Sequence, residues 1–274
     1  MSKAIYMPKG KAGEYAKYAC NFYVGCSNDC DYCYCKRGLL GHAMGGTTPT
    51  LKKCFKDEID AVLTFEKELM KNLEEIRKHG LFFTFTSDPM LESTRKLTIQ
   101  AVDFAIRNDI NCKILTKRAD FIDSLPQWWF YKEYRGNIAF GFTLTGCDEL
   151  EPHASTNAER IEAMRKLHEM GFKTFASIEP VIDIFKSEKM IEQTLDCCDL
   201  YKIGLLSGKK NYARTAITGF VDIVNNMIIG YSIREYREVY VYWKDSVLEY
   251  IQKDRSNQLF RNCHCVGADY NIFQ

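Results

Sequence analysis

Runs of apolar residues alternate along this chain with segments whose apolar positions recur every three or four residues. A short continuous apolar run is typical of a strand buried on both faces, and the helical spacing is typical of a helix that covers one face of a sheet. We predict strands at six such runs, in chain order at 20–25, 81–86, 112–116, 138–145, 173–181 and 199–208.

Segments with helical periodicity separate these strands. The longest, 58–79, presents one apolar face, and Gly80 is placed to end it. A second predicted helix covers 94–107. Thr156 and Glu159 have the spacing of a capping box, in which each residue satisfies a backbone amide of the other, so we predict that a helix begins there.

Strands that alternate with helices predict an α/β fold with a parallel sheet and right-handed crossovers. Six such units are fewer than a closed eight-fold barrel needs, so the sequence predicts a partial (β/α)6 TIM-type barrel. We assign residues 1–230 to this barrel. A further strand and helix are predicted within 231–274, which we assign to a short C-terminal extension that closes or caps the barrel. Functional side chains are expected at the carboxyl ends of the strands.

Composition gives little information about function, but it bears on nucleic-acid binding, membrane association and the role of the cysteines. The 274 residues carry a net charge of +1, so no overall electrostatic attraction to nucleic acid or membrane is predicted. The N-terminus lacks the apolar run of a signal peptide, and no segment approaches the roughly 20 apolar residues that span a bilayer. We therefore expect a cytoplasmic protein without a membrane partner. Thiols stay reduced in the cytosol, so a tight group among the twelve cysteines points to metal binding or catalysis.

One loop carries such a group. Cys26, Cys30 and Cys33 follow the first predicted strand with the spacing C-x3-C-x2-C. Thiolates suit iron–sulfur clusters and zinc. Three of them can hold three irons of a four-iron cluster and leave the fourth iron open to a ligand. Cys35 is only two positions from Cys33, an unfavourable spacing for binding one ion together, but a zinc-binding module built from all four thiols is the non-enzymatic alternative.

The spacing, with aromatic Tyr32 directly before the last of the three cysteines, resembles the cluster motif of the radical SAM superfamily. The resemblance implies that Cys26, Cys30 and Cys33 bind a [4Fe-4S] cluster and that its open iron binds S-adenosyl-L-methionine (SAM), with Tyr32 among the cofactor-binding residues. In that family, reductive cleavage of SAM produces a 5′-deoxyadenosyl radical that abstracts hydrogen from a substrate. An external electron donor of the flavodoxin or ferredoxin type is implied as a partner.

A narrower resemblance covers residues 18–207. The stretches "CDYCYCK", "TSD", "ILTKRADFIDSL" and "FTLTGCDELEPHASTNAERIEAMRKLHEMGFKTFASIEPVI" occur in the order seen in the spore photoproduct lyase-like branch. This resemblance implies that Ser87, Asp88, Lys117, Thr143 and Glu179 bind SAM, and it leaves Glu179 the alternative of touching the substrate. A cation and a few hydroxyls at strand ends can fix a zwitterionic amino acid. Ordinary hydrogen bonding at strand ends is the alternative for Ser87 and Thr143.

Tyr34 matches a tyrosine that relays a hydrogen atom in this branch, which makes it the candidate catalytic residue; packing against the cofactor is the alternative. The match fails at Phe85, where the branch has a cysteine that donates a hydrogen atom. Phenylalanine has no weak bond to hydrogen, so we expect a different radical reaction on the same scaffold. The substrate stays unidentified, with a nucleic-acid base or nucleotide as one candidate.

Charged residues elsewhere support only weaker expectations. Glu151 is expected to point towards the barrel mouth, and Arg160 to form a surface ion pair. A basic and aromatic segment after the sixth strand suits contact with phosphates and bases, or else a solvated helix start. Its members are Lys209, Lys210, Tyr212 and Arg214.

The C-terminal segment contains two more cysteines. Cys263 and Cys265 are candidates for an auxiliary metal site, which Cys35 or Cys54 could complete, or for free thiols near the barrel mouth. An auxiliary cluster would favour the alternative function of a peptide- or protein-modifying radical SAM enzyme. The spacing C-x-C does not decide between these interpretations.

Overall fold

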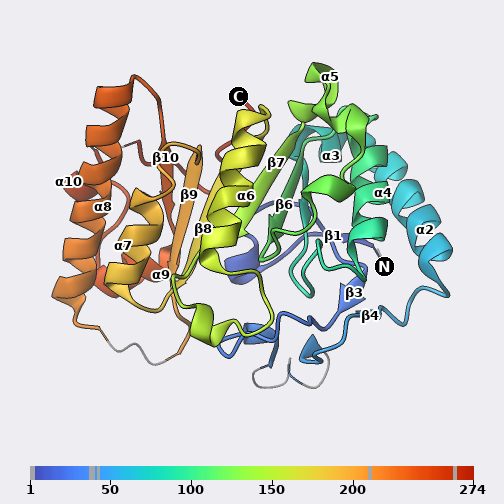
Figure 1. Cartoon of the computed structure of the whole chain (residues 1–274), viewed down its shortest axis with the longest axis horizontal. Helices are drawn as coiled ribbons and strands as arrows, with labels where there is room; N and C mark the ends of the chain where they lie inside the picture. Colours follow the sequence, from blue (N-terminus) through green and yellow to red (C-terminus); the bar gives the residue numbers. More distant parts are fainter. Residues whose placement is uncertain (1–3, 37–40, 42–43, 209–211, 262–263) are drawn as a thin grey trace.

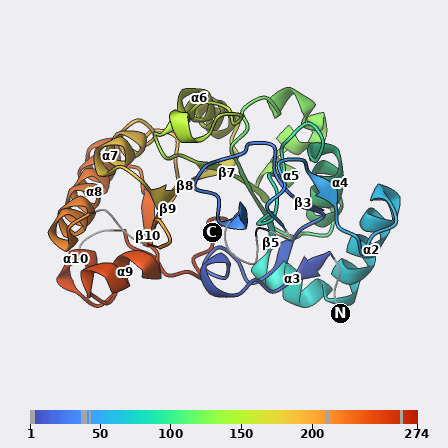
Figure 2. The same cartoon turned by 90° about the horizontal axis from the view of Figure 1, so that it is seen from below.

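The structure, a computed structural model, describes residues 4–36, 41, 44–208, 212–261 and 264–274. Its centre is an eight-stranded sheet in the order β1-β2-β5-β6-β7-β8-β9-β10. In the described part of the chain, β1 is antiparallel to β2, and the other neighbouring pairs of this sheet are parallel. The sheet curves, and its helices lie along the outside of the curve (Figures 1 and 2). The predicted α/β fold with a partial barrel is therefore confirmed.

The strands of both sheets are short except near the middle of the large sheet. Their bounds are β1 Ile5–Tyr6, β2 Ala19–Cys20, β3 Tyr23–Val24, β4 Thr50–Leu51, β5 Leu81–Phe83, β6 Cys112–Thr116, β7 Ile138–Thr143, β8 Lys173–Val181, β9 Leu200–Leu205 and β10 Tyr240–Trp243.

The described helices connect successive strands or follow the last one. The α-helices are α2 Glu58–Lys71, α3 Leu73–His79, α4 Arg95–Ile106, α5 Lys132–Arg135, α6 Asn157–Glu169, α7 Ile184–Glu192, α8 Arg214–Glu235, α9 Asp245–Ile251 and α10 Gln258–Arg261. Short 3-10 turns are η1 Gly10–Ala12, η2 Tyr34–Lys36, η3 Ile122–Ser124, η4 Gln127–Phe130 and η5 Asp148–Leu150.

Alternation along the strands divides the core into two clusters. In β5, Leu81 and Phe83 face the helices and belong to the larger cluster, while Phe82 faces the concave side and belongs to the smaller one. The concave side is crowded near β7. A Cβ atom at Gly141 would lie 2.1 Å from the ring of Phe175, so only glycine fits there. Burial on both faces explains why these strands are continuous apolar runs.

The N-terminal segment fills the concave side of the sheet. Lysines on β6, on β9 and directly after β10 donate to its backbone carbonyls: Lys113 to Tyr15 (3.4 Å), Lys202 to Glu14 (3.0 Å) and Lys244 to Lys11 (3.1 Å). Figure 2 shows this dark blue segment on the inner side of the sheet. The first residues of the chain thus cover the concave side of the sheet, a role that we did not predict for them.

The structure corrects two predicted elements. The strand expected at 20–25 is interrupted, because the chain leaves the large sheet after Cys20 and β3 pairs instead with β4 in a separate two-stranded sheet. The helix expected at 58–79 is two helices. Asn72 lies between them with φ −122°, outside the helical range, so α2 ends and α3 begins there.

Three further predictions concern the start of α6, the boundary at residue 230 and membrane-length segments. The capping box is confirmed, with Thr156 and Glu159 at the start of α6. The division proposed at residue 230 falls inside α8, and β10 beyond it continues the same sheet. We expected no membrane-length apolar segment, yet α8 has the length and composition of one. Length and composition alone are weak evidence for a membrane span, since core helices of other proteins meet the same criteria; 39% of the apolar window of α8 is buried in the structure.

Candidate cofactor site

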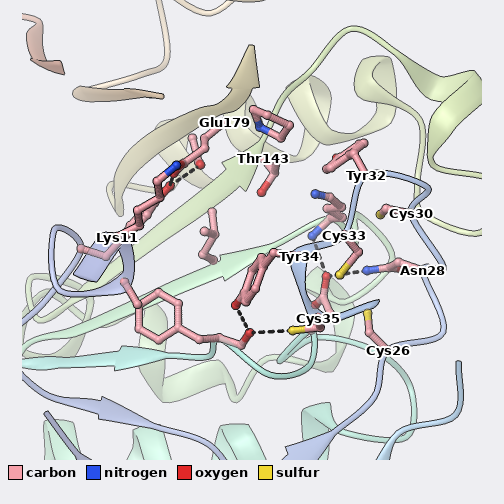
Figure 3. Close-up of a pocket in the computed structure, with 18 of the residues that line it drawn as sticks. Lys11, Cys26, Asn28, Cys30, Tyr32, Cys33, Tyr34, Cys35, Thr143 and Glu179 are labelled. Carbon is pink, nitrogen blue, oxygen red and sulfur yellow. Dashed lines mark hydrogen bonds between the residues drawn. The ribbon is translucent and has the colours of Figure 1, made fainter. Parts of the chain in front are cut away.

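A cavity of about 430 Å³ opens at the carboxyl ends of the strands. The cysteine loop forms one side of it, and the ends of β5 to β9 and the N-terminal segment form the rest. In Figure 3, Cys26, Cys30, Cys33 and Cys35 lie on one side, and Glu179 and Lys11 on the other. The parallel sheet explains this grouping, because the carboxyl ends of its strands meet at one edge.

The cysteine loop is held by backbone contacts to the segment that follows it. Gly25 begins the loop with φ +82°, and a Cβ atom there would lie 2.6 Å from the carbonyl oxygen of Thr48. Glycine is required at this turn on both counts. The Cys26 amide donates to the Gly46 carbonyl (2.9 Å), which fixes the entry to the loop.

Of the predicted cluster ligands, Cys30 is buried and the other two are half-buried. Burial raises the pKa of Cys26 to about 12 and also raises that of Cys30. A hydrogen bond from Cys35 lowers the pKa of Cys33 to about 6, and the same contact raises that of Cys35. The thiol of Cys35 therefore differs in protonation from its neighbour. Binding of a metal would deprotonate the buried ligands.

The donor set suits a cluster better than a single ion. All three thiols line the cavity, but in the described ranges no three Cys, His, Asp or Glu side chains are placed to hold one metal ion. A structural zinc site needs about four ligands around one point. Thiolates that bind different irons of a cluster need not converge in that way. The geometry therefore gives the zinc-module alternative no support.

Asp88 joins the ends of β5 and β6 beneath the loop. Its carboxylate accepts hydrogen bonds from Asn28 Nδ2 (2.8 Å), Thr116 Oγ1 (2.6 Å) and the backbone amides of Met90 (2.9 Å) and Lys117 (2.7 Å). The residue is 6% exposed. With four donors already bound, Asp88 is suited to positioning Asn28 and Lys117 rather than to direct contact with a cofactor.

Two polar atoms beside Asp88 lack partners. Ser87 Oγ and Asn28 Oδ1 are buried and have no hydrogen-bond partner among the described residues. Both residues line the cavity. An unpaired buried hydroxyl or amide oxygen costs free energy, so native structures rarely retain one without a ligand or water to satisfy it. These two atoms are therefore available to a molecule bound in the cavity.

Lys117 belongs to a buried charged network that includes Arg160, for which we expected a surface ion pair. Its Nζ lies 3.5 Å from Glu151 Oε1 and 5.0 Å from the centre of the Tyr32 ring. Glu151 also accepts hydrogen bonds from Tyr32 and from Arg160. Arg160 is fully buried rather than part of a surface pair, because α6 turns it inwards to the Thr143 carbonyl (2.5 Å).

Burial disfavours the charged forms of Lys117 and Glu151, but the oppositely charged and polar partners in this network have the larger effect on both pKa values. Burial would lower the pKa of Lys117, but Tyr32 and Glu151 raise it above its usual value. Burial would raise the pKa of Glu151, but Lys117 and Arg160 lower it. Lys117 is therefore a permanent cation in the cavity wall.

Tyr34 and Phe85 are in direct contact. The Tyr34 hydroxyl donates to the Phe85 carbonyl, and Cys35 Sγ lies 3.7 Å from the same oxygen. The Phe85 ring stacks on Phe82 at 4.5 Å, so it packs in the inner core cluster. Figure 3 shows Tyr34 between the two sides of the cavity.

The side opposite the cysteines contains groups that sequence reasoning missed. Glu179 Oε2 accepts from Tyr15 Oη (2.7 Å) and Lys244 Nζ (2.7 Å), and Lys244 is also 3.2 Å from Glu14. A Cβ atom at Gly204 would lie 2.8 Å from Glu179, so glycine makes room for this pair. Lys244 directly follows the strand that we predicted in the C-terminal extension, and such strand ends are where functional side chains are expected. Tyr15 carries no local signal.

The remaining predicted residues are Thr143, the basic and aromatic segment after β9, and the two C-terminal cysteines. Thr143 ends β7 and lines the cavity. Tyr212 donates to the Val181 carbonyl and Arg214 to Gln252 (2.6 Å), so both are engaged within the protein, while Lys209 and Lys210 lie outside the described residues. Cys263 also lies outside them. Cys265 is disulfide-bonded, so its sulfur is not offered as a thiolate ligand.

Comparisons with known proteins agree with the fold. No family model matches the chain. An uncharacterised protein of Methanocaldococcus jannaschii is 27% identical over 226 residues, covering 77% of this chain and 80% of that protein. This similarity extends over most of both proteins.

Solved structures resemble this one despite low identity. Spore photoproduct lyase complexed with dinucleoside spore photoproduct superposes with a TM-score of 0.63 at 16% identity, covering 87% of this chain and 79% of the lyase. A mutant lyase with bound AdoMet gives 0.56, and this chain covers 63% of its length. SuiB of Streptococcus suis bound to S-adenosylmethionine gives 0.51 at 12% identity, covering 83% of this chain and 47% of SuiB. The chain therefore has the radical SAM, spore photoproduct lyase-like fold.

Proposed function

We propose that this chain, on the radical SAM fold, is an enzyme that cleaves S-adenosylmethionine reductively and abstracts hydrogen from a substrate. One observation carries the proposal. Three thiols of a single loop, the unpaired buried hydroxyl of Ser87 and the buried cation of Lys117 all line one cavity at the carboxyl ends of the strands.

Cys26, Cys30 and Cys33 would hold a [4Fe-4S] cluster at this edge, and SAM would occupy the cavity beside it. When bound, the cluster would supply the one-electron chemistry of reductive SAM cleavage, with the electron coming from an external donor. Cys35 is left out of the ligand set, because it is only two positions from Cys33, an unfavourable spacing for joint binding, and three thiolates leave one iron open to SAM.

The chain's own residues would hold and shield SAM. Lys117 is a permanent cation suited to the carboxylate, and Ser87 Oγ lines the same cavity without a hydrogen-bond partner among the described residues. Asp88 orients this pair through the Lys117 amide, and Tyr32 stacks under the Lys117 ammonium. Thr143 and Glu179 line the same cavity.

Apolar side chains would keep water from the reacting atoms. Leu115, Leu205, Leu206 and Phe85 line the cavity among these polar groups. Exclusion of water protects a radical from side reactions. Tyr34, which lies between the two sides of the cavity, is our candidate for hydrogen-atom transfer.

The substrate is proposed only as a class. The lyase that superposes with a TM-score of 0.63 is complexed with a dinucleoside, so dinucleosides are the first probes. Tyr212 and Arg214 are engaged within the protein and do not support a nucleic-acid contact after β9. We further propose an electron donor of the flavodoxin or ferredoxin type and a cytoplasmic location. The peptide-modifying alternative depended on Cys263 and Cys265, and nothing in the described residues favours it.

The test is production of 5′-deoxyadenosine. Protein reconstituted anaerobically with iron and sulfide is reduced with dithionite, mixed with SAM and analysed by mass spectrometry. We expect product from wild type and from Cys54→Ser, whose thiol is exposed and outside the cavity, and none from Cys30→Ala.

Iron-loaded wild type that neither binds nor cleaves SAM would overturn the proposal. Zinc in place of iron, in protein kept anaerobic throughout, would support the binding module instead. If Cys30→Ala makes no product while its circular dichroism spectrum shows normal folding, the activity depends on the cysteine loop and does not come from a contaminant.

A further inference from the structure

A second cavity, also of about 430 Å³, lies at the end of the sheet opposite the cysteine loop. Residues that come just before β5 and β6 line it, which places it at the amino ends of these parallel strands. Residues within 266–274 form the rest of its wall. Figure 1 shows the C-terminus at this end, away from β3 and β4, and Figure 2 shows it within the curve of the sheet. Among the described residues, the two cavities share no lining residue.

Backbone pairing and packing hold the C-terminal segment in this position. The Val266 amide donates to the Val241 carbonyl (2.9 Å), which attaches the segment to β10. The ring of Tyr270 packs on that of Tyr240 at 4.8 Å, and Ile272 is buried in the inner core cluster. The wall of the cavity is therefore a packed part of the fold.

Lys113 extends from β6 towards the concave side of the sheet and lines this cavity. It alternates with Cys112 and Ile114, which belong to the larger core cluster on the helix side. Its ammonium has one hydrogen bond to a described atom, the Tyr15 carbonyl at 3.4 Å, and no ion pair with a described carboxylate. Burial lowers its pKa to about 8, and no described partner raises it again.

Three other lysines on the inside of the barrel have more partners. Lys117 and Lys244 each have a carboxylate oxygen within 3.5 Å, and Lys202 has two backbone carbonyls and two aromatic rings. An ammonium that is removed from water without such partners costs free energy. An anion in the cavity would provide the partner that Lys113 lacks among the described residues.

Two carboxamides that line the same cavity also present donors. Asn111 Oδ1 accepts from Asn137 Nδ2 (3.0 Å), and Asn271 Oδ1 accepts from the Phe273 amide (3.3 Å). Because their oxygens are engaged in this way, Asn111 and Asn271 have Nδ2 groups that donate to no described atom. The polar groups that the fold leaves open here are therefore hydrogen-bond donors.

The charged groups of the cavity also favour an anion. Lys78 is exposed and adds a second ammonium. Lys17 donates to His79 Nε2 (2.9 Å), so the neutral imidazole has its own proton on Nδ1. Asp269 is the one acidic side chain among the described lining residues. Two ammonium groups thus stand against one carboxylate.

We propose that this cavity is a second ligand site, which binds the phosphate or carboxylate group of a small molecule. Lys113 pairs with the anion, and Asn111 and Asn271 donate to its oxygens. Ionised phosphate and carboxylate oxygens accept hydrogen bonds, which matches a lining that offers donors. A metal ion or an amine would need acceptors instead. The volume falls in the range of roughly 300–1,000 Å³ that is usual for small-molecule sites.

Isothermal titration calorimetry of the full, anaerobically reconstituted chain without SAM tests the proposal. Inorganic phosphate and acetate are the probes. Each is titrated at constant ionic strength, with chloride as the balancing anion, near neutral pH, where Lys113 is protonated. We expect one saturable site. Tighter binding of phosphate would identify the natural ligand as a phosphorylated molecule, and tighter binding of acetate would identify it as a carboxylate.

Three variants connect the binding to this cavity. Lys113→Met should weaken binding at least tenfold, because a charge-assisted hydrogen bond is lost. Lys71→Met on exposed α2 removes the same charge outside the cavity and should leave the affinity unchanged. Asp269→Asn should tighten binding severalfold, because it removes the carboxylate that repels the anion. A gain in affinity cannot result from misfolding.

Absence of saturable binding for both anions would overturn the proposal. So would equal affinities of wild type and Lys113→Met, or weaker binding by Asp269→Asn. These titrations do not measure SAM cleavage, so their outcome is independent of the proposed function.

Discussion

Arg160 and Glu151 form an ion pair in which both side chains are fully buried, directly behind the cysteine loop. The pair joins α6 to the segment after β7. Each of its two side chains also has further hydrogen-bonding or charged partners. Glu151 has Tyr32 and Lys117 as further partners, and Arg160 also bonds the Thr143 carbonyl. A buried pair of this kind tolerates the loss of neither partner, because a charge without a partner in the interior is costly.

Replacing Arg160 with methionine should therefore destabilise the protein strongly. The change leaves Glu151 with one cation fewer and the Thr143 carbonyl without its donor. We expect the free energy of unfolding to fall by about 3–5 kcal/mol in urea denaturation. Arg165→Gln is the control, because its partner Asp196 is half exposed and such pairs contribute roughly 0–1 kcal/mol. Equal losses in both variants would contradict the assignment.

The iron content of serine variants should show that Cys33 binds the cluster and that Cys35 does not. We expect Cys33→Ser to lose most of the iron after anaerobic reconstitution, and Cys35→Ser to retain about the wild-type amount, because three thiolates complete the proposed ligand set. Iron and sulfide analysis and the visible absorption of the cluster measure this. If Cys35→Ser loses the cluster and Cys33→Ser keeps it, the ligand assignment is wrong.

The unpaired hydroxyl of Ser87 should contribute to SAM binding and not to folding. A hydrogen bond with a charged ligand contributes about 1.5–3 kcal/mol, so Ser87→Ala should weaken SAM binding by at least tenfold. Isothermal titration of the iron-loaded protein gives the affinity, and thermal unfolding without SAM should be almost unchanged. Ser232 is the matched control, since its hydroxyl is also buried without a described partner but lies outside the cavity. Similar losses of affinity in both alanine variants would argue against a contact at Ser87.

Stability should rise with pH in the window set by Lys113. Burial lowers the pKa of Lys113 from 10.5 to about 8. Between these values the unfolded chain holds a proton at this lysine that the folded chain has released, so the free energy of unfolding increases as the pH rises. Lys113→Met should lack this part of the slope. Burial and the charge of Lys113 both lower the pKa of Lys202, so removing Lys113 also relieves part of that shift and reduces the slope in the same direction.

Urea denaturation from pH 8 to just below pH 10 checks this expectation, because tyrosines begin to titrate above about pH 10. Lys71→Met on exposed α2 should keep the wild-type slope. Parallel curves for wild type and Lys113→Met would show that Lys113 keeps its ordinary pKa in the folded state.

Features that depend on neighbouring residues in the chain could be predicted from the sequence. The buried strands are continuous apolar runs, the capping box of Thr156 and Glu159 is a contact across three positions, and the three cysteines share one loop. Each depends on spacing within a few residues, which the backbone geometry of a strand, helix or loop converts directly into position.

The tertiary structure alone decided which distant groups meet. Tyr15 and Lys244 are 229 positions apart, yet both bond Glu179, because the N-terminal segment fills the concave side of the sheet that ends with β10. Arg160 has the sequence context of a surface residue, and only the packing of α6 against β7 turns it inwards. The strand expected at 20–25 was interrupted because β3 pairs with β4. In each case the partner that determines the outcome lies far along the chain, so local spacing contains no information about it.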